Sequence, residues 1–170
     1  VVLGDDLLED KDKFLDSGVQ EMYSDEKFPE VDKIASINAY LGAFPIAQAL
    51  NDGADIVITG RSVDSAVTLA ACIHTYGWKE DDYDKLASGS LAGHIIECGT
   101  QSTGGNYTDW ELSTKNLHMI GYPIVDVSEN GEFICTKSKN TSGLVSFGTV
   151  AEQMLYEIGD PQAYILPDVV

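Results

Sequence analysis

The sequence predicts an α/β fold with a mostly parallel sheet, helical crossovers and an antiparallel hairpin excursion. Between residues 33 and 76, short apolar runs alternate with helix-like segments across short joints, a pattern typical of parallel strands connected by helices. Later in the chain, Asn130-Gly131 lies between two alternating runs, which is the strongest short signal for a hairpin. We expect residues 1–170 to form a single α/β domain, or part of one within a longer chain.

The first half of the chain is expected to supply the parallel strands and their crossovers. Its expected elements, in order, are the end of a strand at 1–4, a charged helix at 5–15, a polar connection at 17–33, a strand at 33–41, a helix at 44–50, a buried strand at 55–59 and a helix at 63–76. Gly60 ends the strand at 55–59, and Ser62 is in position to cap the helix that follows. Gly77 ends that helix.

The second half is expected to be more irregular. Its expected elements are one or two helices over 81–98, a polar glycine loop at 101–107, hairpin strands at 123–127 and 132–136, and a helix at 149–158. Pro161 follows Gly159-Asp160 and terminates the last helix. These elements add the antiparallel excursion to the expected sheet.

Charge and cysteine content restrict the class of protein. The 170 residues carry 10 basic and 28 acidic side chains, a formal net charge of −18, which opposes non-specific binding to nucleic acid or to anionic membranes. No run approaches the ~18 apolar residues of a membrane-spanning helix. The three cysteines are unclustered, so we expect reduced thiols and a cytoplasmic location.

The turn after the strand at 55–59 is the first candidate site. Arg61, the sole arginine of the sequence, offers a bidentate fork, and the helix start offers free N–H groups to an anion. Ser62, Asp64 and Ser65 complete this predicted substrate-binding turn. A purely structural interpretation is also open, in which Ser62 caps the helix, Asp64 favours its dipole, and Arg61 pairs with a neighbouring acid.

The segment around His94 is the second candidate site. On a helix, His94, Glu97 and Cys98 share one face because they stand at i, i+3 and i+4. His94 and Glu97 are the predicted catalytic acid–base pair, since histidine titrates near neutral pH. These residue types could also bind zinc, but their spacing matches no standard zinc motif and a fourth ligand is not evident. The remaining alternative is that His94 has a purely structural role. We identify no metal site and no cofactor.

A glycine loop directly follows this segment. Thr103, Gly104, Gly105 and Asn106 could donate hydrogen bonds to a substrate oxyanion, or they could form a simple turn. The loop lacks the lysine and spacing of a P-loop, and no Gly-x-Gly-x-x-Gly follows a strand, so nucleotide hydrolysis and dinucleotide binding have no support.

Four strings in the same order resemble the acyclic terpene utilisation (AtuA, DUF1446) family. They are residues 54–61 (ADIVITGR), 91–99 (LAGHIIECG), 101–106 (QSTGGN) and 152–161 (EQMLYEIGDP). The resemblance covers most of residues 36–170 and is looser over 1–33. It implies a role in the degradation of acyclic terpenoids or branched-chain acids, which proceeds through coenzyme A esters, and a large α/β domain extending beyond this sequence.

We therefore expect a catabolic enzyme or enzyme subunit that acts on a small organic acid or a coenzyme A ester, with hydratase- or lyase-like chemistry. The alternative is a non-catalytic binding or scaffold subunit of an acyl-CoA carboxylase or hydratase system. The expected partners are the small-molecule substrate, the rest of the same polypeptide, an acyl-CoA carboxylase-type protein and further copies of the chain in a homo-oligomer.

Overall fold

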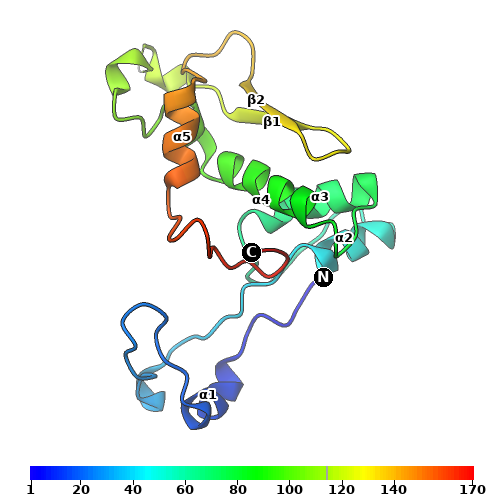
Figure 1. Cartoon of the computed structure of the whole chain (residues 1–170), viewed down its shortest axis with the longest axis vertical. Coiled ribbons are helices and arrows are strands. Elements are labelled where there is room, and N and C mark those ends of the chain that lie inside the picture. Colours follow the sequence, from blue (N-terminus) through cyan, green and yellow to red (C-terminus); the bar gives the residue numbers. More distant parts are fainter. Residues whose placement is uncertain (114) are drawn as a thin grey trace.

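The computed structural model describes residues 1–113 and 115–170 as a mixture of helices and strands (Figure 1). In the described residues, five α-helices accompany a two-stranded antiparallel sheet: α1 Lys11–Ser17, α2 Phe44–Asn51, α3 Ala66–Tyr76, α4 Tyr83–Glu97, β1 Pro123–Val127, β2 Phe133–Lys137 and α5 Phe147–Leu155. Short 3₁₀ turns lie at Leu8–Asp10, Val31–Lys33, Gly99–Thr103, Trp110–Leu112 and Leu117–Met119. None of the described helices is both long and apolar enough to cross a membrane.

The expected mostly parallel sheet is not found in the described residues. Three extended segments instead meet through isolated parallel bridges, Val2 with Thr59 and Leu41 with Ser62. Each contact is one rung rather than a ladder, so the expected strands at 1–4, 33–41 and 55–59 remain extended segments. Ile56 and Ile58 are 82% and 65% exposed, because helices cover one face of these segments and leave the other bare. The prediction that residues 55–59 are buried was therefore wrong.

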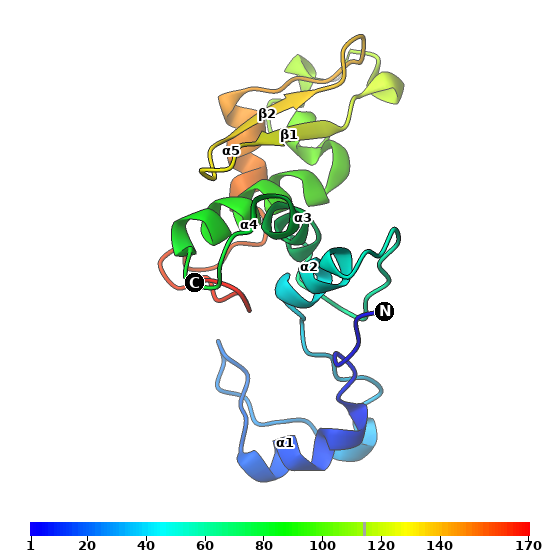
Figure 2. The same ribbon diagram turned by 90° about the vertical axis from the view of Figure 1, so that its right-hand side faces the viewer.

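The core lies where α2, α3 and α4 pack side by side (Figure 2). Leu69 of α3 and Leu86 of α4 are almost fully buried, and burying such a side chain contributes about 1.5–3 kcal/mol. Trp78, in the connection between these helices, is buried and donates its indole N–H to the Glu129 carbonyl at 2.9 Å. That bond ties the hairpin to the helical core.

The local elements of the second half follow the sequence closely. The hairpin pairs Val127 with Phe133 across the predicted Asn-Gly turn, so this prediction was right. Residues 83–97 form a single helix rather than two. Helix α5 begins two residues earlier than expected because Ser146 and Thr149 form a reciprocal capping box at its start.

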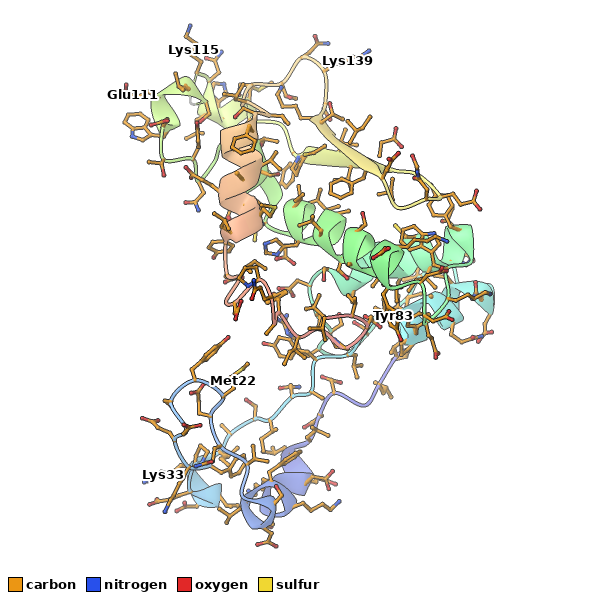
Figure 3. The ribbon with its side chains drawn as sticks, viewed as in Figure 1. Met22, Lys33, Tyr83, Glu111, Lys115 and Lys139 are labelled. Atoms are coloured by element: carbon orange, nitrogen blue, oxygen red, sulfur yellow. The ribbon has the colours of Figure 1, made fainter. Side chains whose placement is uncertain are left out.

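The N-terminal arm, residues 7–36, lies away from the helical core in both views (Figures 1 and 2). The aromatic rings of Phe14 and Phe28 stack within it, with their centroids 6.2 Å apart. Figure 3 shows Met22 and Lys33 on this arm, at the end of the molecule opposite to Glu111 and Lys115. The arm therefore contributes little to the core around α3 and α4.

After α5 the chain turns back beneath α4 (Figure 1), and we call residues 157–170 the strap. Asp168 anchors it by accepting a hydrogen bond from the Ala43 backbone N–H, at the start of α2, at 2.8 Å. Gly42 permits this contact, because a Cβ there would lie 2.4 Å from the Asp168 carboxylate. Val169 packs against the core beside this anchor.

Candidate functional site

A cavity of about 890 Å³ lies between α4, the turn that precedes α3, and the strap. Five of the residues predicted from the sequence line it: Arg61, Asp64, Ser65, His94 and Glu97. The strap and α4 supply an aliphatic lining that includes Leu91, Ile158, Ile165, Leu166 and Val169. The fold thus combines polar groups from two separate sequence motifs with an apolar wall.

His94 and Glu97 form a buried pair on α4. The Nδ1 atom of His94 lies 3.0 Å from Glu97 Oε1, and their side chains are 9% and 13% exposed. His94 Nε2 lies 2.9 Å from the Gln153 carbonyl oxygen, which can only accept, so Nε2 carries a proton. The hydrogen bond to Glu97 raises the pKa of His94 above 6.5, against the opposing effect of burial. Because both ring nitrogens are engaged, Glu97 is the member of the pair that is free to face a ligand.

Gln153 is a site residue to which the sequence analysis assigned no role. It lies on α5, is 2% exposed, and donates from Nε2 to the His94 carbonyl at 2.8 Å. Together with the bond that His94 donates to the Gln153 carbonyl, this contact joins α5 to α4 in both directions. No local signal in the sequence marks Gln153, because the buried residues of α5, Thr149 and Gln153, are both polar.

Arg61 is held by several contacts rather than standing free. Its Nη1 lies 3.0 Å from Asp64 Oδ1, and its guanidinium carbon lies 4.3 Å from the centre of the Tyr40 ring. Its backbone N–H donates to Asp5 at 2.7 Å, and this bond lowers the pKa of the Asp5 carboxyl. Both Arg61 and Asp64 remain about half exposed, so their ion pair forms an open rim of the cavity.

A second, smaller cavity of about 580 Å³ adjoins the same rim. Arg61, Asp64 and Glu97 border both cavities. Its lining mixes hydroxyl side chains such as Ser62 with glycine backbone and apolar side chains such as Val67. The two cavities therefore share the Arg61–Asp64–Glu97 group, and each is lined by both polar and apolar groups.

Ser62 does not cap the helix as expected. Helix α3 begins at Ala66, its N-cap residue is Ser65, and no side chain caps it by a hydrogen bond. The parallel bridge between Leu41 and Ser62 keeps the backbone extended there, which delays the start of the helix. Ser62 and Ser65 consequently line different cavities, the smaller and the larger respectively.

The glycine loop lies outside both cavities, because Thr103, Gly104, Gly105 and Asn106 line neither of them. The fully buried Thr103 hydroxyl donates to the Gly121 carbonyl at 2.6 Å. The backbone N–H groups of Gly104 and Gly105 bond within their own turn, and Asn106 is exposed. The loop therefore uses its own donors to fold, and the structure does not bring it to His94 and Glu97.

Cys98 lies beside the smaller cavity. Burial is the main cause that raises the pKa of its thiol, so the thiol stays protonated near neutral pH and is a poor nucleophile. In the part of the chain that the structure describes, no group of three or more His, Cys, Asp or Glu residues is arranged to hold a metal ion.

These features define a mixed helix–strand protein with a cavity that is lined by a buried His–Glu pair and bordered by an exposed Arg–Asp ion pair. The model for the family "Acyclic terpene utilisation family protein AtuA" matches residues 1–170. The chain belongs to this family, as the four sequence strings predicted, and the match includes the N-terminal arm, where the resemblance was looser. The family description associates the chain with acyclic terpene utilisation. No curated protein and no solved structure matches it.

Proposed function

We propose that this protein is a cytosolic catabolic enzyme, or enzyme subunit, that binds a small organic acid or a coenzyme A ester of acyclic terpenoid or branched-chain acid degradation. One observation carries the proposal: Arg61, Asp64, Ser65, His94 and Glu97 converge on one cavity with an aliphatic wall. Such a cavity, with a few polar groups at one end, is typical of small-molecule sites.

The proposed reaction is a proton transfer, as in a hydratase or lyase. Glu97 is the acid–base group that faces the ligand, and His94 stabilises the negative charge of the Glu97 carboxylate by its hydrogen bond. Proton transfer by a positioned carboxyl group contributes typically ~10²–10⁴-fold to rate. Arg61 orients the carbonyl or carboxylate end of the ligand at the rim, while the strap and α4 enclose its carbon chain.

Thermal unfolding with a ligand panel tests this proposal. Coenzyme A, branched acyl-CoA esters and the matching free acids are each added to the protein, to Arg61→Ala and to Glu97→Gln. A ligand present at ~100 times its Kd stabilises the protein by about 2.7 kcal/mol. We expect a shift with at least one acid or ester that is lost in Arg61→Ala and retained in Glu97→Gln, which should bind without turnover. No shift with any compound would contradict the proposal.

A non-catalytic scaffold role is the second candidate, and one specific observation favours it. Large apolar side chains stand bare on the surface, with Phe147 93% exposed and Val1, Leu3 and Ile56 more than 75% exposed. Val1, Leu3 and Ile56 lie on neighbouring extended segments that the Val2–Thr59 bridge joins, and exposed apolar side chains that lie together typically mark contacts with other protein surface. The partner would be the rest of the polypeptide, a second copy in a homo-oligomer, or an acyl-CoA carboxylase-type protein. This role would be supported if Ile56→Asp abolished assembly with the partner and if turnover by the assembled complex did not depend on Glu97.

A further inference from the structure

We infer that Glu157 is a second proton-transfer residue of the larger cavity, and that the chain retains a strained turn because this turn places the Glu157 carboxylate in the same cavity as Glu97. This inference rests on the proposed function and adds a catalytic residue to it. Two independent observations carry it: the backbone conformation of Glu157 and the place of its side chain in the cavity lining.

Glu157 stands at a turn position that favours glycine. Where the strap leaves α5 (Figure 1), Tyr156 has φ −64° and ψ 127°, and Glu157 has φ 60°. The Ile158 N–H donates to the Leu155 carbonyl at 3.4 Å. These values describe a type II β-turn, whose third residue has a positive φ and is usually glycine or asparagine. A glutamate is strained there, because its Cβ crowds the backbone.

No other non-glycine residue that the structure describes combines this conformation with a place in the larger cavity. The remaining described residues of this kind are Asp25, Asn116 and Asn140, and none of them lines that cavity. Aspartate and asparagine adopt a positive φ more readily, since their short side chains can hydrogen-bond locally. Glutamate lacks this compensation, and strained residues cluster at functional sites. The strain therefore indicates that the Glu157 side chain is retained for what it does in the cavity.

Glu157 and Glu97 reach the larger cavity from different elements, the strap and α4. The hydrogen bond to Glu97 is the main cause that raises the pKa of His94, and the charge of Glu157 raises it further. Burial is the main cause that raises the pKa of the Tyr164 hydroxyl, and the charges of Glu97 and Glu157 raise it further. His94 and Tyr164 both line this cavity. Because both groups sense the two carboxylates, Glu97 and Glu157 flank the same space.

A second carboxyl group supplies what the His94–Glu97 pair lacks. Both ring nitrogens of His94 are engaged, so His94 has no free atom that could move a second proton. In a dehydration, one carboxylate takes a proton from the carbon beside the ligand carbonyl, and the C–H electron pair forms the C=C bond. The hydroxyl on the next carbon leaves with the C–O electron pair and takes a proton from the second carboxyl group, so water departs. One carboxyl group gains a proton and the other loses one, and hydration is the reverse.

Thermal unfolding without ligand tests the strain. Glu157→Gly removes the Cβ from a positive-φ position and should leave Tm unchanged or raise it by up to about 4 °C. Asp25→Gly is the matched control, because Asp25 is also acidic, has φ 55° and is exposed on the N-terminal arm. The control should respond in the same way. If Tm falls in Glu157→Gly but not in Asp25→Gly, the Glu157 side chain holds the turn together, and the inference is wrong.

Mass spectrometry in D₂O at pD 7.5 tests the proton transfer. The probe is 3-methylbut-2-enoyl-coenzyme A, which can add water across its double bond. Glu157→Gln should lower the rate of hydration at least ~100-fold, while the probe still shifts Tm. Glu97→Gln should do the same, and the double variant should be little worse than either, since residues that act in one step are not additive. Asp25→Gly should hydrate the probe as fast as the unaltered protein.

The outcomes separate this inference from the proposed function. If Glu157→Gln hydrates the probe at the unaltered rate while Glu97→Gln does not, the inference fails and the proposed function stands. The inference also fails alone if the two single losses add in the double variant, because Glu157 then acts apart from Glu97. If the unaltered protein binds the probe without hydrating it, the second proton-transfer role is wrong while the proposed binding stands. If neither the probe nor any compound of the ligand panel binds, both fail.

Discussion

Replacing Gly93 with alanine tests how closely α4 packs against the turn that precedes α3. A Cβ at Gly93 would lie 2.7 Å from the Ser65 carbonyl oxygen and 2.8 Å from the Ser65 Cα atom. Both obstacles are backbone, so no side-chain rotation can relieve the clash. Ordinary contact begins at 3.4 Å, and the two segments would have to separate by most of an ångström. The start of α3 and the Arg61–Asp64 rim would move with them.

The expected cost follows from two opposing effects. Overpacking of a well-packed site typically costs about 1–3 kcal/mol, while replacing an interior helical glycine with alanine returns about 1 kcal/mol. Because both obstacles are backbone, the cost lies at the upper end of this range, and we expect a net loss of about 2 kcal/mol in the free energy of unfolding. For a chain of this length each kcal/mol shifts Tm by about 2–4 °C, so Tm should fall by about 4–8 °C. Ligand binding should weaken as well, because the rim is displaced.

Thermal and urea unfolding followed by circular dichroism measure this loss. Gly148→Ala is the matched control, since the Cβ there would meet the Tyr107 ring and its hydroxyl, the far end of a side chain that can rotate away. The control should leave stability unchanged or slightly raised. If Gly93→Ala is as stable as the control, the close approach of α4 to Ser65 does not exist, and the geometry of the rim is wrong with it.

Three further predictions concern single contacts. Because the pKa of His94 is raised, its pair with Glu97 stabilises the protein fully below pH ~6.5, and this stability is lost as pH rises through the folded pKa. Glu97→Gln should abolish that pH dependence in urea unfolding series; an unchanged slope would mean that the pair does not form. Asp168→Ala leaves the Ala43 N–H without its acceptor and should cost about 1 kcal/mol, with faster hydrogen exchange at Ala43 and through the strap; equal protection would show that the strap is not anchored there. Ser146→Ala removes the capping box of α5 and should cost about 1 kcal/mol, restored in part by Ser146→Asp; no loss of Tm would contradict the cap.

The sequence located the hairpin and the helices after residue 43 well because their signals are local, whereas the helix expected at 5–15 begins only at Lys11. The Asn130-Gly131 turn, the apolar period of residues 66–76 and the glycine after Tyr76 each act within a few residues. The sheet was overpredicted for the converse reason. Whether an extended run joins a ladder depends on its neighbours, and residues 55–59 have one bridge to residues near the N-terminus instead of a paired strand.

The candidate site shows the same contrast between local contacts, which the sequence predicted, and long-range contacts, which it did not. His94 and Glu97 could be paired from the sequence because i, i+3 spacing on a helix places them together, and Arg61 meets Asp64 at the same spacing. The glycine loop seemed suited to an oxyanion because its composition is permissive, but composition does not reveal that Thr103 bonds to Gly121, 18 residues away.

The sequence by itself determined the family, most of the helices, the hairpin and the His94–Glu97 pair, because the signals for these elements and for this pair lie in residues that are neighbours along the chain. Only the tertiary structure decided what surrounds that pair. Gln153 reaches His94 across 59 residues, and Asp168 reaches Ala43 across 125. The first contact holds α5 against α4, the second anchors the strap at the start of α2, and the strap supplies one wall of the larger cavity. Their partners are selected by packing of the whole chain, which no local pattern encodes.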